Sequence, residues 1–346
     1  MIYFLFLLLI VSCSSMKIAG EGQFHKDYLS KENTTAINGI FVVLVLLCHF
    51  TQYVRFRSGL VDQSFLFFKS HLGQLVVTTF LFFSGYGIIC SISKKGMPYV
   101  KSIPKKRFLS VLIHFDIAVA LFMLLNLCLG KSYPLRINLL ALTGWESIGN
   151  SNWYILAILC LYLIVFISFI VCRGNKYIGT VITAVLTVGF IYLMIRAKKP
   201  PYYYNTLICY PLGMFYGLFK DKLDKVFMKS DFLYTCFIAI ALAGFLFFYR
   251  MRSKGVEQFS LCCVFFIGVI VLAMMKIQLN NGFLQLTGSH VFAIYILQRI
   301  PMAVFKKIGL ADHRYIFLIA TFIVTLALTF IFDKCMAVID KKILRK

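Results

Sequence analysis

The stretch "NGIFVVLVLLCHF", Asn38 to Phe50, is an apolar run with an asparagine at its start and a histidine near its end. A helix that spans a bilayer needs about 20 mainly apolar residues, and this run lies inside such a segment. Eleven residues at about 100° each return to nearly the same helix face, so Asn38 and His49 share a face about 16 Å apart. A face with two polar side chains is hidden from lipid, in a helix contact or along a polar cavity.

Similar apolar runs recur along the whole chain. Its 346 residues are 60% hydrophobic and 14% charged, with a mean hydropathy of +0.85, whereas a soluble domain carries about 25% charged residues. The sequence therefore predicts an all-α, polytopic membrane protein. We expect about ten transmembrane helices, at 36–54, 72–92, 108–129, 152–172, 178–196, 202–219, 232–250, 259–276, 284–305 and 315–338.

The basic residues indicate a topology. The formal net charge is +23, but the Lys and Arg residues lie mostly in short connections, and no basic face on a soluble segment favours a nucleic-acid partner. Segment 93–107 holds six basic residues and no acid, which places it in the cytoplasm by the positive-inside rule. We therefore expect both termini to be cytoplasmic, a basic tail at 339–346 and location in the cell's cytoplasmic membrane.

Residues 1–35 form a leader that three interpretations fit. "MIYFLFLLLIVSC" (1–13) is too short to span comfortably and lacks the positive residue that precedes a signal peptide's apolar region. It is a non-cleaved anchor, a signal-like segment, or a stretch before a true start at Met16. Most of the 11 cysteines lie in apolar runs, so we expect neither a disulfide framework nor a metal site.

Few ionisable groups lie within the expected spans, and such groups are by default candidates for function. They include His49, His114, Asp116, His290 and Asp333. His114 and Asp116 are two residues apart and do not share a helix face. Asp116 is a candidate for a place in a polar cavity.

Four stretches together resemble the integral-membrane acyltransferase 3 family, the O-acetyltransferases of cell-surface glycans. In that family a basic residue, ten further positions and a histidine open the first helix; His49 matches the histidine, and Asn38 stands at the basic position. The other three stretches are "TFLFFSGYGII" (79–89), "NWYILAILCLYL" (152–163) and "TGSHVFAIYILQRIP" (287–301). Gln298 stands at a family histidine and Ser110 at a second arginine after Arg107. The resemblance runs from about Thr35 to Ala337.

The resemblance implies transfer of an acyl group, most often acetyl, from a cytoplasmic thioester such as acetyl-CoA to a sugar hydroxyl. The acceptor would be a surface polysaccharide or a lipid-linked sugar. His49 is the expected general base, since an imidazole can take the proton of an attacking hydroxyl. No tightly bound cofactor or metal is expected. The other candidates are oxyanion donors (Ser84, Trp153, Tyr154), phosphate contacts for the donor (Lys105, Lys106, Arg107) and substrate-orienting side chains (Asn38, Tyr295, Gln298).

Two other functions fit the same residues. The chain could be a transporter or flippase for a lipid-linked glycan, although the internal repeats typical of transporters are not visible. It could also be a non-catalytic family member, because Asn38, Ser110 and Gln298 all lack a charge that the family pattern has. In "SGYG" (84–87), the small residues indicate tight helix packing or substrate passage.

Overall fold

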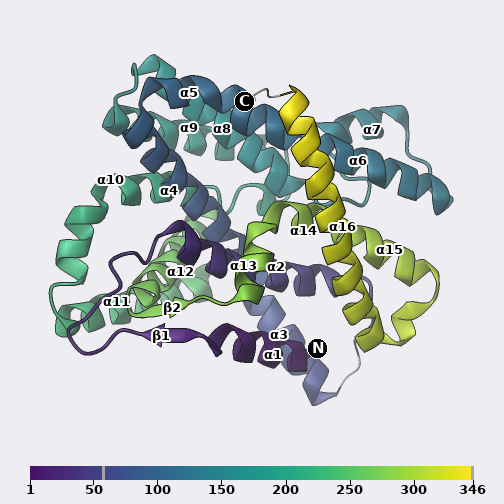
Figure 1. The fold of residues 1–346 in the computed structure, drawn as a ribbon, viewed down its shortest axis with the longest axis horizontal. Coiled ribbons are helices and arrows are strands. Elements are labelled where there is room, and N and C mark those ends of the chain that lie inside the picture. The colour runs from purple at the N-terminus through teal and green to yellow at the C-terminus, as the bar shows by residue number, and fades with distance from the viewer. Residues whose placement is uncertain (57–58, 344–346) are drawn as a thin grey trace.

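The computed structural model describes residues 1–56 and 59–343, and these are almost entirely helical (Figure 1). The first half contains α1 (Ile2–Cys13), α2 (Lys31–Phe50), α3 (Leu60–Leu72), α4 (Thr78–Lys95), α5 (Met97–Ile103), α6 (Ser110–Cys128), α7 (Leu135–Leu142) and α8 (Trp153–Val171). The second half contains α9 (Lys176–Arg196), α10 (Cys209–Phe227), α11 (Asp231–Met251), α12 (Val256–Lys276), α13 (Gly282–Ser289), α14 (Val291–Leu297), α15 (Arg299–Lys307) and α16 (Arg314–Ile343). The predicted all-α class is confirmed, apart from a small antiparallel ribbon of β1 (Met16–Ile18) and β2 (Ile277–Leu279).

Eight helical segments of the described residues are long and apolar enough to cross a bilayer. They match eight of the ten predicted spans, and the chain is a multi-pass membrane protein. Their bounds are Lys31–Phe50, Leu60–Lys95, Met97–Cys128, Trp153–Val171, Lys176–Arg196, Asp231–Met251, Val256–Lys276 and Arg314–Lys342.

The other two predicted spans differ from the structure, so the count of ten is not confirmed. In place of 202–219, α10 starts at Cys209 and continues into charged residues, among them Lys220 and Asp224. In place of 284–305, three short helices follow one another, with breaks at His290 and Gln298. Pro301 contributes to the second break, because it has no N–H to bond to the carbonyl of Leu297.

The leader is part of the folded structure. β1 pairs with β2 in the register Met16↔Leu279. Nearby, the Lys276 ammonium donates to the Gln23 carbonyl at 2.8 Å and contacts the Asp231 carboxylate at 2.6 Å. The Met1 amine lies near Arg314, at the start of α16. Met1 and Ile343 therefore lie at opposite ends of α16 (Figure 1). The cytoplasmic location of both termini stays a prediction.

Two close helix contacts fix the centre of the fold. At Gly39 in α2, an added Cβ would stand 2.7 Å from the Thr287 hydroxyl oxygen in α13. At Gly85 in α4, an added Cβ would stand 2.9 Å from the carbonyl carbon of Tyr210 in α10. Small residues permit such backbone approach between membrane helices. The contact of α2 with α13 matters for function because Gly39 follows Asn38 directly.

Candidate functional site

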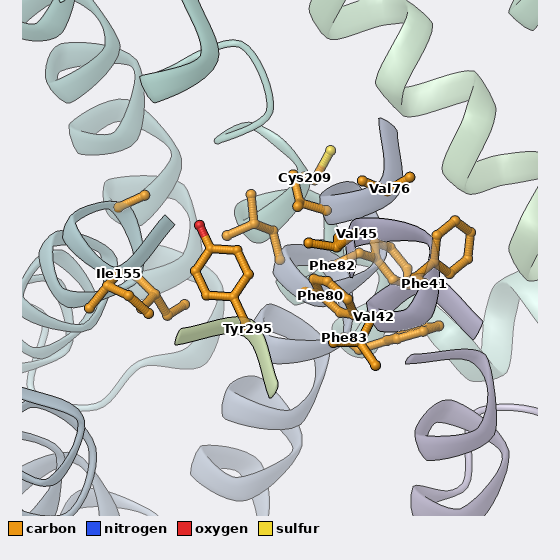
Figure 2. Close-up of a cluster of buried hydrophobic side chains, with 14 of the residues drawn as sticks. Phe41, Val42, Val45, Val76, Phe80, Phe82, Phe83, Ile155, Cys209 and Tyr295 are labelled. Carbon is orange, nitrogen blue, oxygen red and sulfur yellow. The ribbon is translucent and has the colours of Figure 1, made fainter. Parts of the chain in front are cut away.

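A cavity of about 410 Å³ lies among α2, α4, α6, α8 and α14. It brings together five of the candidate side chains that the sequence singled out, namely Asn38, Ser84, Arg107, Tyr154 and Tyr295. Its apolar wall is made by Phe80, Phe83, Val111, Ile155, Ile158, Val291 and Phe292. Figure 2 shows Tyr295 beside Ile155, with Phe80 and Phe83 across from them.

Helix α2 carries Asn38 to the cavity. The helix starts where the Ser30 hydroxyl accepts a hydrogen bond from the Asn33 amide at 3.2 Å, a common N-cap arrangement. The close contact at Gly39 then holds α2 against α13. Asn38 lines the cavity, and its buried Oδ1 has no hydrogen-bond partner in the described part of the chain. A ligand group with an N–H or O–H could bond to this oxygen.

Arg107 reaches the cavity from a π-helical turn at Pro104–Leu109, between α5 and α6. Such turns are rare and recur at functional sites. The Arg107 Nε donates to the Tyr99 hydroxyl at 3.3 Å, and the exposed guanidinium side chain lines the cavity. Lys105 and Lys106 are exposed on the same turn but do not line it. Arg107 is therefore the one member of the predicted donor-binding trio that lies in the cavity wall.

His49 lies next to the cavity and not in its wall. The ring centroids of His49 and Tyr295 are 6.0 Å apart, and those of Tyr295 and Tyr154 are 5.6 Å apart. Tyr295, which lines the cavity, is thus a direct ring neighbour of the imidazole. The His49 Nδ1 is buried and has no partner among residues 1–56 and 59–343. Asn38 and His49 therefore both lie close to Tyr295, Asn38 in the cavity wall and His49 beside it.

Arg299 is a residue near His49 that the sequence analysis missed. Its Nε donates to the Ser151 hydroxyl at 3.1 Å, and its Nη1 donates to the Gln52 side-chain oxygen at 2.9 Å. It is the charged group whose field acts on His49. Arg299 thus connects α15 to the chain after α2 and to the loop before α8. An arginine inside the apolar run "FAIYILQRIP" was the available indication.

Three further candidates lie outside the cavity wall. Gln298 is fully buried at the break between α14 and α15, where its Nε2 donates to the Tyr295 carbonyl at 3.1 Å. It does not face the cavity together with Tyr295, because the helix that would align them is interrupted there. Trp153 packs against Tyr154 and Tyr202. Asp116 does not line the cavity, contrary to our expectation.

The histidines of α6 and of the α13–α14 break contact α16. The His114 Nε2 lies 3.0 Å from the Asp340 carboxylate, and His290 bonds to Asp333. The two pairs connect successive parts of α16 to its neighbours. Neither histidine lines the cavity, and the two pairs hold α16 against its neighbours.

Unpaired polar atoms gather around this site. Among the described residues, buried atoms without a partner include Asn38 Oδ1, His49 Nδ1, Tyr210 OH and Gln298 Oε1. Each such atom costs about 1–3 kcal/mol in a folded protein. Several at one place indicate a site where a polar ligand or water completes the hydrogen bonds. With a cation at one end and an imidazole near the other, the arrangement can bind an anionic ligand and accept a proton.

Comparison with known proteins now gives the family. No curated protein and no solved structure matches the chain. The sequence model described as an acyltransferase domain matches residues 35–334, which include every cavity-lining residue except Thr34. This match covers most of the 346 residues. The chain belongs to the acyltransferase 3 family and is a multi-pass membrane protein of that family.

Proposed function

We propose that this protein transfers an acyl group, in most turnovers acetyl, from a cytoplasmic CoA thioester to a sugar hydroxyl. The acceptor is a cell-surface polysaccharide or a lipid-linked sugar, and the enzyme acts in the cytoplasmic membrane. One observation carries the proposal: Asn38, Arg107 and Tyr295 share a cavity inside the helix bundle, and the His49 ring lies 6.0 Å from the Tyr295 ring.

The donor end of the cavity suits a polyanionic thioester. Arg107 offers a planar cation that can bond to a phosphate through two N–H groups. Lys105 and Lys106 are exposed on the same turn and add positive charge where a nucleotide would enter. The apolar wall around Phe83 and Ile158 suits a short acyl chain.

The transfer needs one proton acceptor and one hydrogen-bond donor that stabilises the developing oxyanion. The hydroxyl oxygen attacks the thioester carbonyl carbon while His49 takes its proton, the C–S bond breaks, and the proton ends on the thiolate. Ser84 and Tyr154 line the cavity and can donate to the developing oxyanion.

Mass spectrometry of surface glycans from cells with and without the gene tests the reaction. Loss of the gene should remove about 42 mass units per acetyl group from the acceptor. His49→Ala should give the same loss at normal expression, whereas His71→Ala, a histidine of α3 outside the site, should keep the modification. Transfer at the wild-type rate in His49→Ala would contradict the role of His49 as base.

A transporter for a lipid-linked glycan is the second candidate, and the interrupted helix α13–α14–α15 favours it. Transporters often bind substrates at broken helices near the middle of the membrane. A transporter would change how much glycan reaches the surface and leave its acyl content unchanged. The same mass spectra, with total surface glycan measured in parallel, separate the two functions.

A further inference from the structure

Both tryptophans of the chain lie beside the site. The chain has 2 tryptophans, and Trp145 and Trp153 flank the loop that leads into α8. The loop before α10 adds Tyr202 and Tyr203. We call these four residues the Trp cluster. Tyr202 is 40% exposed and lies 6.1 Å from Trp153 and 5.1 Å from Tyr203, measured between ring centroids.

Hydrogen bonds hold the Trp cluster in place. The Lys199 ammonium lies 4.1 Å from the centre of the Trp145 ring and donates to the Trp145 carbonyl at 2.6 Å. The Tyr203 hydroxyl accepts from the Asn152 side-chain amide at 2.9 Å. A cation over a tryptophan face and a buried amide bond both restrict the rings. The cluster is therefore a preformed surface, as binding sites usually are.

A carboxylate follows Trp145 in the chain. The Glu146 side chain is 42% exposed, and its Oε1 lies 3.4 Å from the Lys199 ammonium. A sugar ring has C–H groups on its faces and hydroxyls around its edge. It can pack a face on an aromatic ring while its hydroxyls bond to a carboxylate or an amide.

The rings continue from the surface to the imidazole. Trp153 lies 6.0 Å from Tyr154, Tyr154 lies 5.6 Å from Tyr295, and Tyr295 lies 6.0 Å from His49. Ser151, two residues before Trp153, accepts the hydrogen bond from Arg299. A ligand on Tyr202 and Trp153 would therefore lie next to the residues that surround His49.

We propose that the Trp cluster binds a sugar unit of the acceptor and holds it so that a hydroxyl points toward Tyr295 and His49. This inference rests on the proposed function, since it names where the acceptor of that reaction binds. Tryptophan and tyrosine also gather at membrane interfaces as anchors. Anchoring alone accounts for the exposed Tyr202 ring but not for the ring contacts that connect Trp153 through Tyr154 and Tyr295 to His49.

Intrinsic tryptophan fluorescence tests the proposal without a need for activity, because both fluorophores belong to the Trp cluster. The purified full chain in nanodiscs is titrated with maltohexaose and with chitohexaose. We expect a saturable emission change with at least one of them. It should persist in Trp145→Phe and be lost in Trp153→Phe. Tyr202→Ala should weaken binding about tenfold, equivalent to about 1.4 kcal/mol.

Tyr192→Ala is the matched control, because Tyr192 is a tyrosine of α9 that is 59% exposed. Its binding curve should equal that of the unaltered protein. No emission change with either oligosaccharide, or equal curves for Tyr202→Ala and Tyr192→Ala, would leave interfacial anchoring only and overturn the proposal. His49→Ala should bind the oligosaccharide normally, so a failure of acyl transfer and a failure of sugar binding are observed separately.

Discussion

Replacing Gly85 by alanine should separate α4 from α10. A Cβ at this position would overlap the Tyr210 carbonyl oxygen and stand 2.9 Å from the carbonyl carbon, whereas ordinary contacts begin at 3.4 Å. The obstacle is main chain, which cannot rotate away as a flexible side chain can. Because the carbonyl oxygen is the nearer obstacle, the two helices must move apart by about an ångström. Gly213 in α10 faces the Phe82 backbone of α4 in the same way, so the two backbones are already in close contact at both glycines.

The expected cost follows from overpacking. Extra methyl groups in a well-packed interior typically destabilise by about 1–3 kcal/mol, and a backbone obstacle favours the upper part of that range. Gly87 offers a control two residues away, because a Cβ there meets nothing within 4 Å. Gly87→Ala should be neutral or stabilise by up to about 1 kcal/mol, since alanine loses less conformational freedom in a helix.

Thermal unfolding of the purified protein in one detergent compares the two variants. Gly85→Ala should lower the apparent Tm by several degrees, and Gly87→Ala should leave it at or above that of the unaltered protein. Acyl transfer should also fall in Gly85→Ala, because Ser84 and Phe83 of the same helix line the cavity. Equal Tm values for the two variants would refute the claim that Gly85 serves close packing.

Three other changes address the site. Gly39→Ala should reduce both acyl transfer and the apparent Tm, because its Cβ would press on Thr287. Gly282→Ala, where an added Cβ meets nothing within 4 Å, should change neither. Acyl-transfer and thermal-unfolding assays test both variants. Arg107→Ala should raise the KM for the acyl donor about tenfold or more and change the acceptor KM little, because Arg107 can bond to a phosphate of the donor. Lys101→Ala, at an exposed lysine, is the control. Initial rates at varied donor concentration measure the KM, and an unchanged donor KM in Arg107→Ala would refute the prediction. Lys199→Met should remove a cation–π contact worth about 0.5–2 kcal/mol and shift the Trp145 emission to longer wavelength; an unchanged spectrum would contradict this contact.

The hydrophobic runs predicted most of the fold, because a span needs a length and a composition that are local in sequence. The helix break at Gln298 cannot be predicted from apolar content alone; the available signals were Arg299 and Pro301, which follow Gln298 closely. The span predicted at 202–219 was placed too early, because residues 201–208 form a 3-10 helix and turns and α10 starts only at Cys209.

The site was predicted in part, and the reason is again the range of the pattern. The eleven-residue spacing of Asn38 and His49 is a property of one helix, so their common face could be stated from sequence. The meeting of Asn38 with Arg107 depends on the contact of α2 with α13 and on the π-helical turn. The approach of Arg299 to His49 depends on a tertiary contact with Gln52. No sequence spacing contains that information.

The departures from the family pattern remove charge at individual positions but not from the site as a whole. Asn38 stands at a basic position, yet the cation Arg107 lines the same cavity. Gln298 stands at a histidine position, yet Arg299 follows it and is bonded beside His49. Arg107 and Arg299 are held by neighbouring elements, Arg107 on the π-helical turn and Arg299 at the start of α15. The positive charge that α2 and α14 lack at Asn38 and Gln298 is therefore supplied close by from other parts of the chain.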